Sequence, residues 1–349
     1  MSSVTKNLFK KDSFSDPKML WTGIEEDSKL YLQISEVLKK SYPNIYHKKL
    51  TLKVSGIGKL NSSNVLIKNK KYEYVMKIFP SKKIHSANYL EMINNKLKNN
   101  FYNVPLLEEN STGRGYTKHK SSIFLLYEKV GNRHYLGEKG EFESFFEIFK
   151  NFSKNYPADK YNYFKQPLLS KNAEERLKKF ISLKWKSNPL EKYQKIVQIN
   201  SDFLSKKIKF VQEKLLLYNF NNLRPLHIDL HPHNIAVSGN SMYFLDLEAI
   251  HLTSLSRSLG FAFYKLIRQS VANGLDIKHF HNFFKSTSFL DFLEEFNLTK
   301  DELKIAASQE VLRRIFILID LLEKGDSDWV FVLPMHLNGL KEIDIIFET

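Results

Sequence analysis

The chain has 349 residues, of which 42% are hydrophobic and 26% charged, so it can bury a sizeable core and at this length is expected to form two domains or lobes. It has no cysteine, which excludes disulfides, thiolate zinc sites and cysteine nucleophiles. The net charge of +15 reflects either a polyanionic partner or a lysine-rich composition. Because the lysines are scattered and form no basic stripe with interleaved aromatics, nucleic acid is not expected as a partner.

The ends and the apolar stretches of the chain bear on its location. The N-terminal "MSSVTKNLFKKDSF" lacks the apolar run of a signal peptide. The most apolar helical stretch, "IFILIDLL", is too short to span a bilayer. We therefore expect a cytoplasmic protein without a transmembrane segment, whose oligomeric state the sequence leaves open.

The first half of the chain is dominated by strands. Residues 1–48 match no pattern that we can assign. The segments "LTLKVSGIG", "SSNVLIKN", "YEYVMKIF", "VPLLEEN" and "SSIFLLYEKV" read as short strands between residues 50 and 130. Between them, apolar residues recur at helical spacing from Ile84 to Leu97 and predict one helix.

After Gly131 the pattern becomes mostly helical. "EFESFFEIFKNFSKNY" and the segment from Leu190 to Tyr218 predict amphipathic helices, and residues from Leu255 onward predict several more. A hairpin is expected around Gly239–Asn240. The chain is therefore expected to be α+β, with an unassigned extension over 1–48, a β-rich part over 49–130 and a mostly helical part over 131–349.

The stretch "LHIDLHPHNIAV" (residues 226–237) gathers the polar residues of most interest. Its three histidines, His227, His231 and His233, raise the possibility of a zinc site. Pro232 and Asn234 interrupt any helix that would place two of these histidines on one face. With thiolates also absent, zinc is the less favoured interpretation.

A phosphoryl-transfer site is the favoured interpretation of the same stretch. Asp229 and Asn234 lie on one Pro-containing loop. The expected hairpin would bring its second strand, which ends at Asp246, back beside the strand that starts at Ile235. Asp246 would then lie near Asn234. Carboxylate and amide oxygens suit Mg²⁺, and phosphoryl transfer needs little more than positioning and charge neutralisation.

Residues upstream supply the remaining parts of such a site. Lys77 lies in the apolar strand "YVMKIF", where an unpaired lysine is costly, and Glu91 on the following helix is a candidate partner. The turn "SGIGKLNSSN" offers small residues through which a backbone can approach phosphates closely. Its candidate phosphate contacts are Gly56, Gly58, Ser62 and Ser63.

At this point the sequence resembles the aminoglycoside phosphotransferase and choline kinase family, whose fold is protein-kinase-like. "HIDLHPHN" is similar to the family's H-x-D-x-x-x-x-N catalytic loop, "FLDLE" to its metal-binding I-D-x-E, "YVMKIF" to its third strand and "FLLYEKVGNRHY" to its hinge. The resemblance implies a bilobal fold, with a small β-rich N-lobe containing one helix and a larger, mostly helical C-lobe.

Carried onto this sequence, the resemblance implies a role for each candidate. Asp229 would be the catalytic base, and His227 would brace its loop. Asn234 and Asp246 would bind Mg²⁺. Lys77 would contact the α/β-phosphates of ATP and pair with Glu91. The hinge backbone from Glu128 to Val130 would bind adenine.

Two positions depart from the family pattern. Ile228 stands where many relatives have glycine, and Gly260 stands where relatives often carry an aspartate that supports the loop. The second departure leaves open what supports the loop here.

The expected activity is transfer of the γ-phosphoryl group of ATP to a hydroxyl of a sugar, amino sugar or amino alcohol, with Mg²⁺. Because the chain is basic, an anionic or neutral acceptor is as plausible as a cationic one. The alternative is a non-catalytic kinase-like binding module. A protein kinase is disfavoured because D-F-G and A-P-E are missing.

Overall fold

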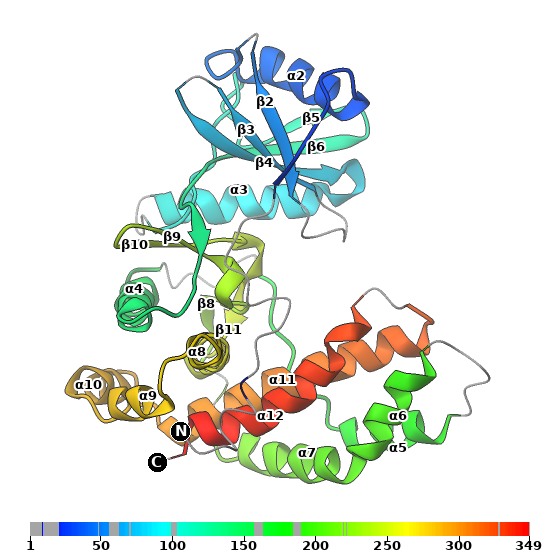
Figure 1. Ribbon diagram of the computed structural model, residues 1–349, viewed down its shortest axis with the longest axis vertical. Helices are drawn as coiled ribbons and strands as arrows, with labels where there is room; N and C mark the ends of the chain where they lie inside the picture. The colour runs from blue at the N-terminus through cyan, green and yellow to red at the C-terminus, as the bar shows by residue number, and fades with distance from the viewer. Residues whose placement is uncertain are drawn as a thin grey trace.

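The computed structural model describes residue 9 and residues 21–47, 49–55, 63–69, 71–98, 103–156, 163–183, 190–218, 220, 222–326 and 329–348. Over these residues the chain forms two lobes, a β-rich lobe and a larger helical lobe, which Figure 1 shows one above the other. This confirms the α+β bilobal fold expected from the sequence.

The N-lobe is built on a six-stranded antiparallel sheet with the order β1-β2-β3-β4-β6-β5. Its strands are β1 (Trp21–Gly23), β2 (Thr51–Ser55), β3 (Ser63–Lys68), β4 (Glu73–Pro80), β5 (Thr117–His119) and β6 (Ser122–Glu128). The stretch "VPLLEEN", expected to be a strand, contributes only the isolated bridge between Leu107 and Tyr127. Pro105 lacks an N–H and cannot extend a ladder there.

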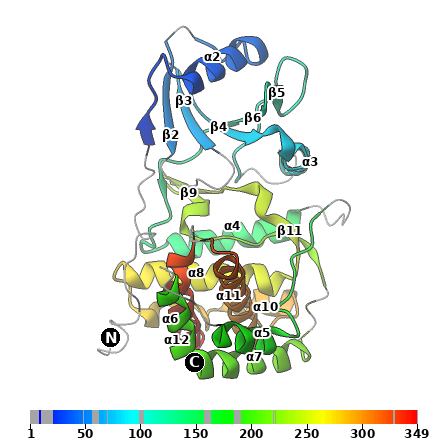
Figure 2. The same cartoon turned by 90° about the vertical axis from the view of Figure 1, so that its right-hand side faces the viewer.

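Two helices cover opposite faces of this sheet. Helix α2 (Lys29–Ser41) lies on the side away from the C-lobe, and α3 (Ile84–Lys98) lies between the sheet and the C-lobe (Figure 2). Successive side chains of β6 point to opposite faces of the sheet. Phe124 packs in the core on the α2 side, and Leu125 packs in the core on the α3 side. The N-lobe therefore has one helix more than expected, and β1, from the segment left unassigned, joins its sheet.

The C-lobe combines helices with two small sheets. Its helices are α4 (Glu141–Asn155), α5 (Ala173–Ser182), α6 (Glu191–Ile199), α7 (Ser201–Leu215), α8 (Leu255–Ala272), α9 (Ile277–Phe283), α10 (Thr287–Glu295), α11 (Lys300–Glu323) and α12 (Leu333–Ile346). The sheets are β10-β9-β7 and β11-β8, with β7 (Arg133–His134), β8 (Arg224–His227), β9 (Ile235–Ser238), β10 (Ser241–Phe244) and β11 (Ile250–Thr253). The expected hairpin is confirmed by the pairing of Ser238 with Ser241.

The central helix pair of the C-lobe, α8 and α11, approaches very closely. A Cβ atom on Gly260 would lie 2.4 Å from the carbonyl oxygen of Leu303, so only glycine fits this crossing. Beside it, the buried Arg257 on α8 pairs with the buried Glu310 on α11 at 2.7 Å. Gly260 is thus explained by helix packing and not by support of the loop that carries Asp229. No helix in the described part of the chain is long and apolar enough to cross a membrane.

Candidate active site

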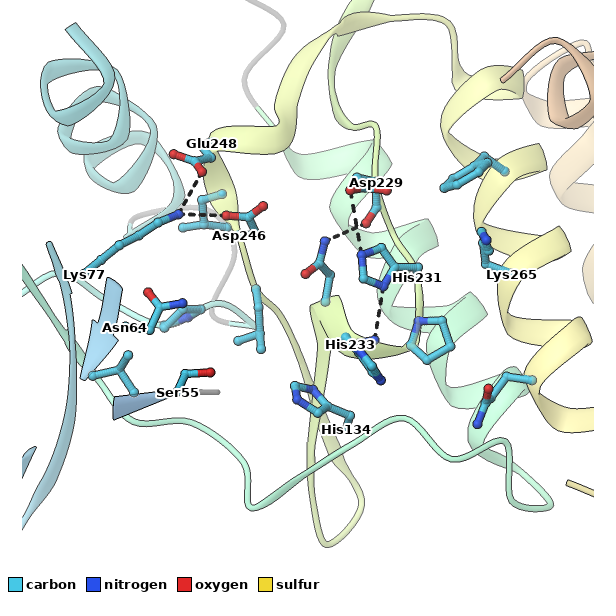
Figure 3. A pocket seen from close by; sticks show the side chains of 18 of the residues that line it. Ser55, Asn64, Lys77, His134, Asp229, His231, His233, Asp246, Glu248 and Lys265 are labelled. Carbon is cyan, nitrogen blue, oxygen red and sulfur yellow. Dashed lines mark hydrogen bonds and ion pairs between the residues drawn. The ribbon is translucent and has the colours of Figure 1, made fainter. Parts of the chain in front are cut away.

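A cleft of about 670 Å³ lies between the lobes and is lined by residues of both. The predicted residues that line it are Lys77, Glu128, Val130, Asp229, Asn234 and Asp246. Figure 3 shows Lys77 on one side of the cleft, Lys265 of α8 on the other, and Asp229 and His231 between them. The structure therefore brings together in one cavity residues that are far apart in the sequence.

The loop that carries Asp229 is held by His227. The Nδ1 of His227 accepts a hydrogen bond from the Asp229 N–H at 3.2 Å, so Nε2 carries the proton and donates to the Leu245 carbonyl at 2.8 Å. Burial lowers the pKa of His227, which keeps the ring neutral in this role. The ring thus ties the Asp229 loop to the residue preceding Asp246.

Helix α8 supplies the support for this loop that the family pattern lacks at Gly260. The Ser258 hydroxyl donates to the His227 carbonyl at 2.6 Å, and both residues are buried. The sequence offered no periodicity or motif to indicate this contact, because serine in a helix is usually unremarkable.

Asp229 is paired with Arg314 of α11, whose Nη2 lies 2.6 Å from Oδ1. Burial alone would raise the pKa of Asp229, but the charge of the Arg314 guanidinium outweighs burial and lowers it. The carboxylate is therefore ionised over the whole neutral range. Arg314 was not predicted, because it lies far along the chain from the loop and carries no motif.

Two neighbouring histidines are kept neutral. Burial lowers the pKa of His231 to about 4; Asp229 opposes this shift, and the nearby Lys265 and Arg314 add to it. Burial also lowers the pKa of His134 to about 4, with help from His233 and His231.

Among the described residues no group of three or more His, Asp or Glu side chains is arranged to bind a metal, so the zinc interpretation has no support.

Asn234 and Asp246 offer oxygens toward the same region. The Asn234 Nδ2 donates to the Asp229 carbonyl at 2.9 Å, which leaves Oδ1 without a hydrogen bond among the described residues. Asp246 adopts a left-handed backbone conformation with φ 55°, a strain of order 1–3 kcal/mol that is typical of functional sites. A carboxamide oxygen and a carboxylate are the donor set that Mg²⁺ uses beside phosphates, where one or two protein ligands suffice.

The expected ion pair between Lys77 and Glu91 is not found and is corrected. Lys77 lies 2.9 Å from both Asp246 and Glu248, which come from the C-lobe (Figure 3). Burial would lower the pKa of Lys77, but these two carboxylates outweigh it and raise the pKa. Glu91 instead binds Arg114 at 2.7 Å and the Gly115 N–H at 2.7 Å.

The remaining predicted contacts fall at the hinge and the glycine turn. Glu128 and Val130 line the cleft, and the Val130 N–H makes no hydrogen bond within the described part of the chain. Gly56, Gly58 and Ser62 lie outside the described residues. Ser63 is exposed at the start of β3 and is not a lining residue, whereas its neighbour Asn64 lines the cleft.

Three solved structures of small-molecule kinases are similar in fold to this chain. A spectinomycin phosphotransferase in complex with ADP and spectinomycin is 14% identical, covering 90% of this chain and 97% of its own, with a TM-score of 0.68. An ethanolamine kinase of Plasmodium vivax is 14% identical, with coverage of 91% and 89% and a TM-score of 0.57. An amicoumacin kinase in complex with AMP-PNP, Ca²⁺ and Ami is 16% identical, with coverage of 83% and 87% and a TM-score of 0.54.

These likenesses extend over nearly the whole chain and establish a protein-kinase-like fold. No family model and no curated protein matches the sequence.

Proposed function

We propose that the protein is an ATP-dependent phosphotransferase that moves the γ-phosphoryl group to a hydroxyl of a small molecule, with Mg²⁺. The observation that carries the proposal is the convergence of Lys77, Asn234, Asp246 and Asp229 on one interlobe cleft. The small-molecule kinases with the same fold support a small hydroxyl acceptor. In this proposal the N-lobe, residues 49–130, contacts the nucleotide, and the C-lobe, residues 131–349, contacts the acceptor.

The nucleotide end of the cleft is assigned to the N-lobe and hinge. The Val130 N–H, which makes no hydrogen bond to a described residue, can donate to adenine. The Lys77 ammonium neutralises phosphate charge. Asn234 and Asp246 would hold Mg²⁺, which neutralises charge on the phosphates and orients them. The magnesium dependence of this chain and its cytoplasmic location stay predictions.

Asp229 is assigned to the acceptor hydroxyl. A carboxylate with a lowered pKa is a weak base, so it orients the hydroxyl by accepting its hydrogen bond and takes the proton late. This is sufficient for phosphoryl transfer, because the transition state is loose and depends mainly on positioning. Arg314 keeps Asp229 ionised and fixes the direction of its Oδ1.

The test is an acceptor screen that follows ADP formation, run with the parent protein and with Asp229→Asn. Loss of the positioned carboxylate should reduce transfer by about 10²–10⁴-fold while the nucleotide still raises the unfolding temperature. Asp202→Asn, an exposed site on α7, is the matched control and should behave as the parent. Equal transfer rates for Asp229→Asn and the parent would remove the assignment.

A further inference from the structure

The wall of the cleft opposite Lys77 is strongly basic. We call it the acceptor wall and define it as the cleft-lining side chains of α8, α11 and α12. Its charged members are Lys265, Arg268 and Arg314, and no carboxylate lines the cleft from these three helices within the described residues. A cationic acceptor would be repelled by these three cations, with no carboxylate of the acceptor wall to offset them.

The ion pairs of the acceptor wall leave one cation over. Arg314 forms an ion pair with Asp229. Arg268 forms an ion pair with the buried Glu342, in which the Arg268 Nε lies 3.0 Å from the Glu342 Oε2. Lys265 has no ion pair or hydrogen bond to any described residue. Its ammonium instead lies over the rings of Tyr264 and Phe261, at 5.1 and 5.7 Å from the centroids.

The surroundings of Lys265 disfavour its positive charge. Burial lowers the pKa of Lys265 to about 7, and the cations Arg314 and Arg268 add to the effect more than Glu342 and Asp229 offset it. Burial also lowers the pKa of His336, and the positive charges of Lys265, Arg314 and Arg268 add to this shift. An anion bound here would relieve this repulsion, whereas an ammonium group would increase it.

Two further polar nitrogens of the acceptor wall lack partners among the described residues. The Arg314 Nε and the Nδ1 of His336, a residue only 5% exposed, are buried without a hydrogen bond in the described part of the molecule. Phe261 covers the face of the Arg314 guanidinium at 4.3 Å, so the guanidinium is held in place. Buried donors without partners are costly and are usually completed by a ligand or water.

We propose that the acceptor alcohol carries an anionic group, a phosphate or carboxylate, which binds Lys265 of the acceptor wall while the hydroxyl faces Asp229. The inference rests on the proposed function and names the substrate class for the same cleft. The Arg314 Nε and His336 are the neighbouring groups that such an anion would reach. The acceptor is therefore distinguished by charge from amines and amino sugars that lack an acidic group.

The test compares matched probes by calorimetric titration without nucleotide, so that binding is measured whether or not the protein transfers phosphate. The probes are ribose 5-phosphate and ribose, glycerol 3-phosphate and glycerol, lactate, and ethanolamine. We expect the anionic probes to bind at least about tenfold more tightly than their neutral partners, and ethanolamine to bind most weakly. Failure of the phosphotransfer screen with this pattern intact would count against the proposed function alone.

Four variants locate the anion site, and one of them, Lys77→Met, tests the phosphate end of the cleft instead. Lys265→Met should remove the preference for anionic probes, and Lys265→Arg should retain most of it, which separates lost charge from misfolding. Lys278→Met, an exposed lysine on α9, is the charge-matched control and should behave as the parent. The inference is overturned if Lys265→Met binds anions as Lys278→Met does, if Lys77→Met alone abolishes their binding, or if ethanolamine binds best.

Discussion

Replacing Ser258 with alanine should slow catalysis more than it destabilises the fold. The Ser258 hydroxyl donates 2.6 Å to the His227 carbonyl, and His227 in turn positions the Asp229 N–H and the Leu245 carbonyl. A neutral hydrogen bond contributes about 0.5–1.5 kcal/mol, and a buried carbonyl left without a donor costs about 1–3 kcal/mol. If this energy is lost from positioning Asp229, kcat falls by between about twofold and about a hundredfold.

The matched control is Ser256→Ala on the same helix. Ser256 is equally buried, but its hydroxyl bonds Ser254 at 3.0 Å and does not touch the catalytic loop. Urea unfolding should give similar losses of stability for the two variants, whereas initial rates of ADP formation should fall only for Ser258→Ala. If Ser258→Ala keeps the parent kcat while losing as much stability as Ser256→Ala, the reasoning about loop support is refuted.

Three further predictions concern stability, each measured by urea unfolding. Gly260→Ala forces α8 away from the Leu303 carbonyl and should cost at least about 1–3 kcal/mol; an unchanged midpoint would contradict the close crossing. Arg257→Met leaves Glu310 buried without its main partner and should cost about 3–5 kcal/mol, and a neutral effect would mean that Glu310 finds other compensation. The pKa of His134 is lowered to about 4. Its contribution to the free energy of unfolding is therefore complete above about pH 6.5 and is lost as pH falls toward 4, at up to about 1.4 kcal/mol per pH unit. His134→Gln should reduce this dependence of stability on pH.

The elements that the sequence predicted well are those with strong local patterns. The alternation in "YEYVMKIF" and the helical spacing from Ile84 to Leu97 correspond to β4 and α3. The segment from Leu190 to Tyr218 reads as one helix, but the structure divides it at Asn200, whose side chain caps the Ile196 carbonyl. Strands β8 and β11 were missed because each has only four residues, too few to show a clear alternation.

The candidate site divides in the same way. Asp229, Asn234 and Asp246 carry a local motif, and the hairpin between them fixes their separation, so sequence reasoning could place them together. Arg314 and Lys265 have no local signal, because each reaches the cleft only through the packing of α8 against α11. The partner of Lys77 could not be read from spacing either, since Glu91 is drawn to Arg114 by two hydrogen bonds at 3.0 and 2.7 Å.

The correction at Lys77 changes how the lobes depend on each other. Lys77 on β4 is held by Asp246 and Glu248 of the C-lobe, and Tyr89 of α3 donates a hydrogen bond to the carbonyl of Ile250 close by. The N-lobe is thus attached to residues 246–250 of the C-lobe by both β4 and α3. Since Asp246 is the carboxylate proposed to bind Mg²⁺ and Lys77 is the group proposed to neutralise phosphate charge, the charge state of the cleft and the relative position of the lobes depend on the same contacts.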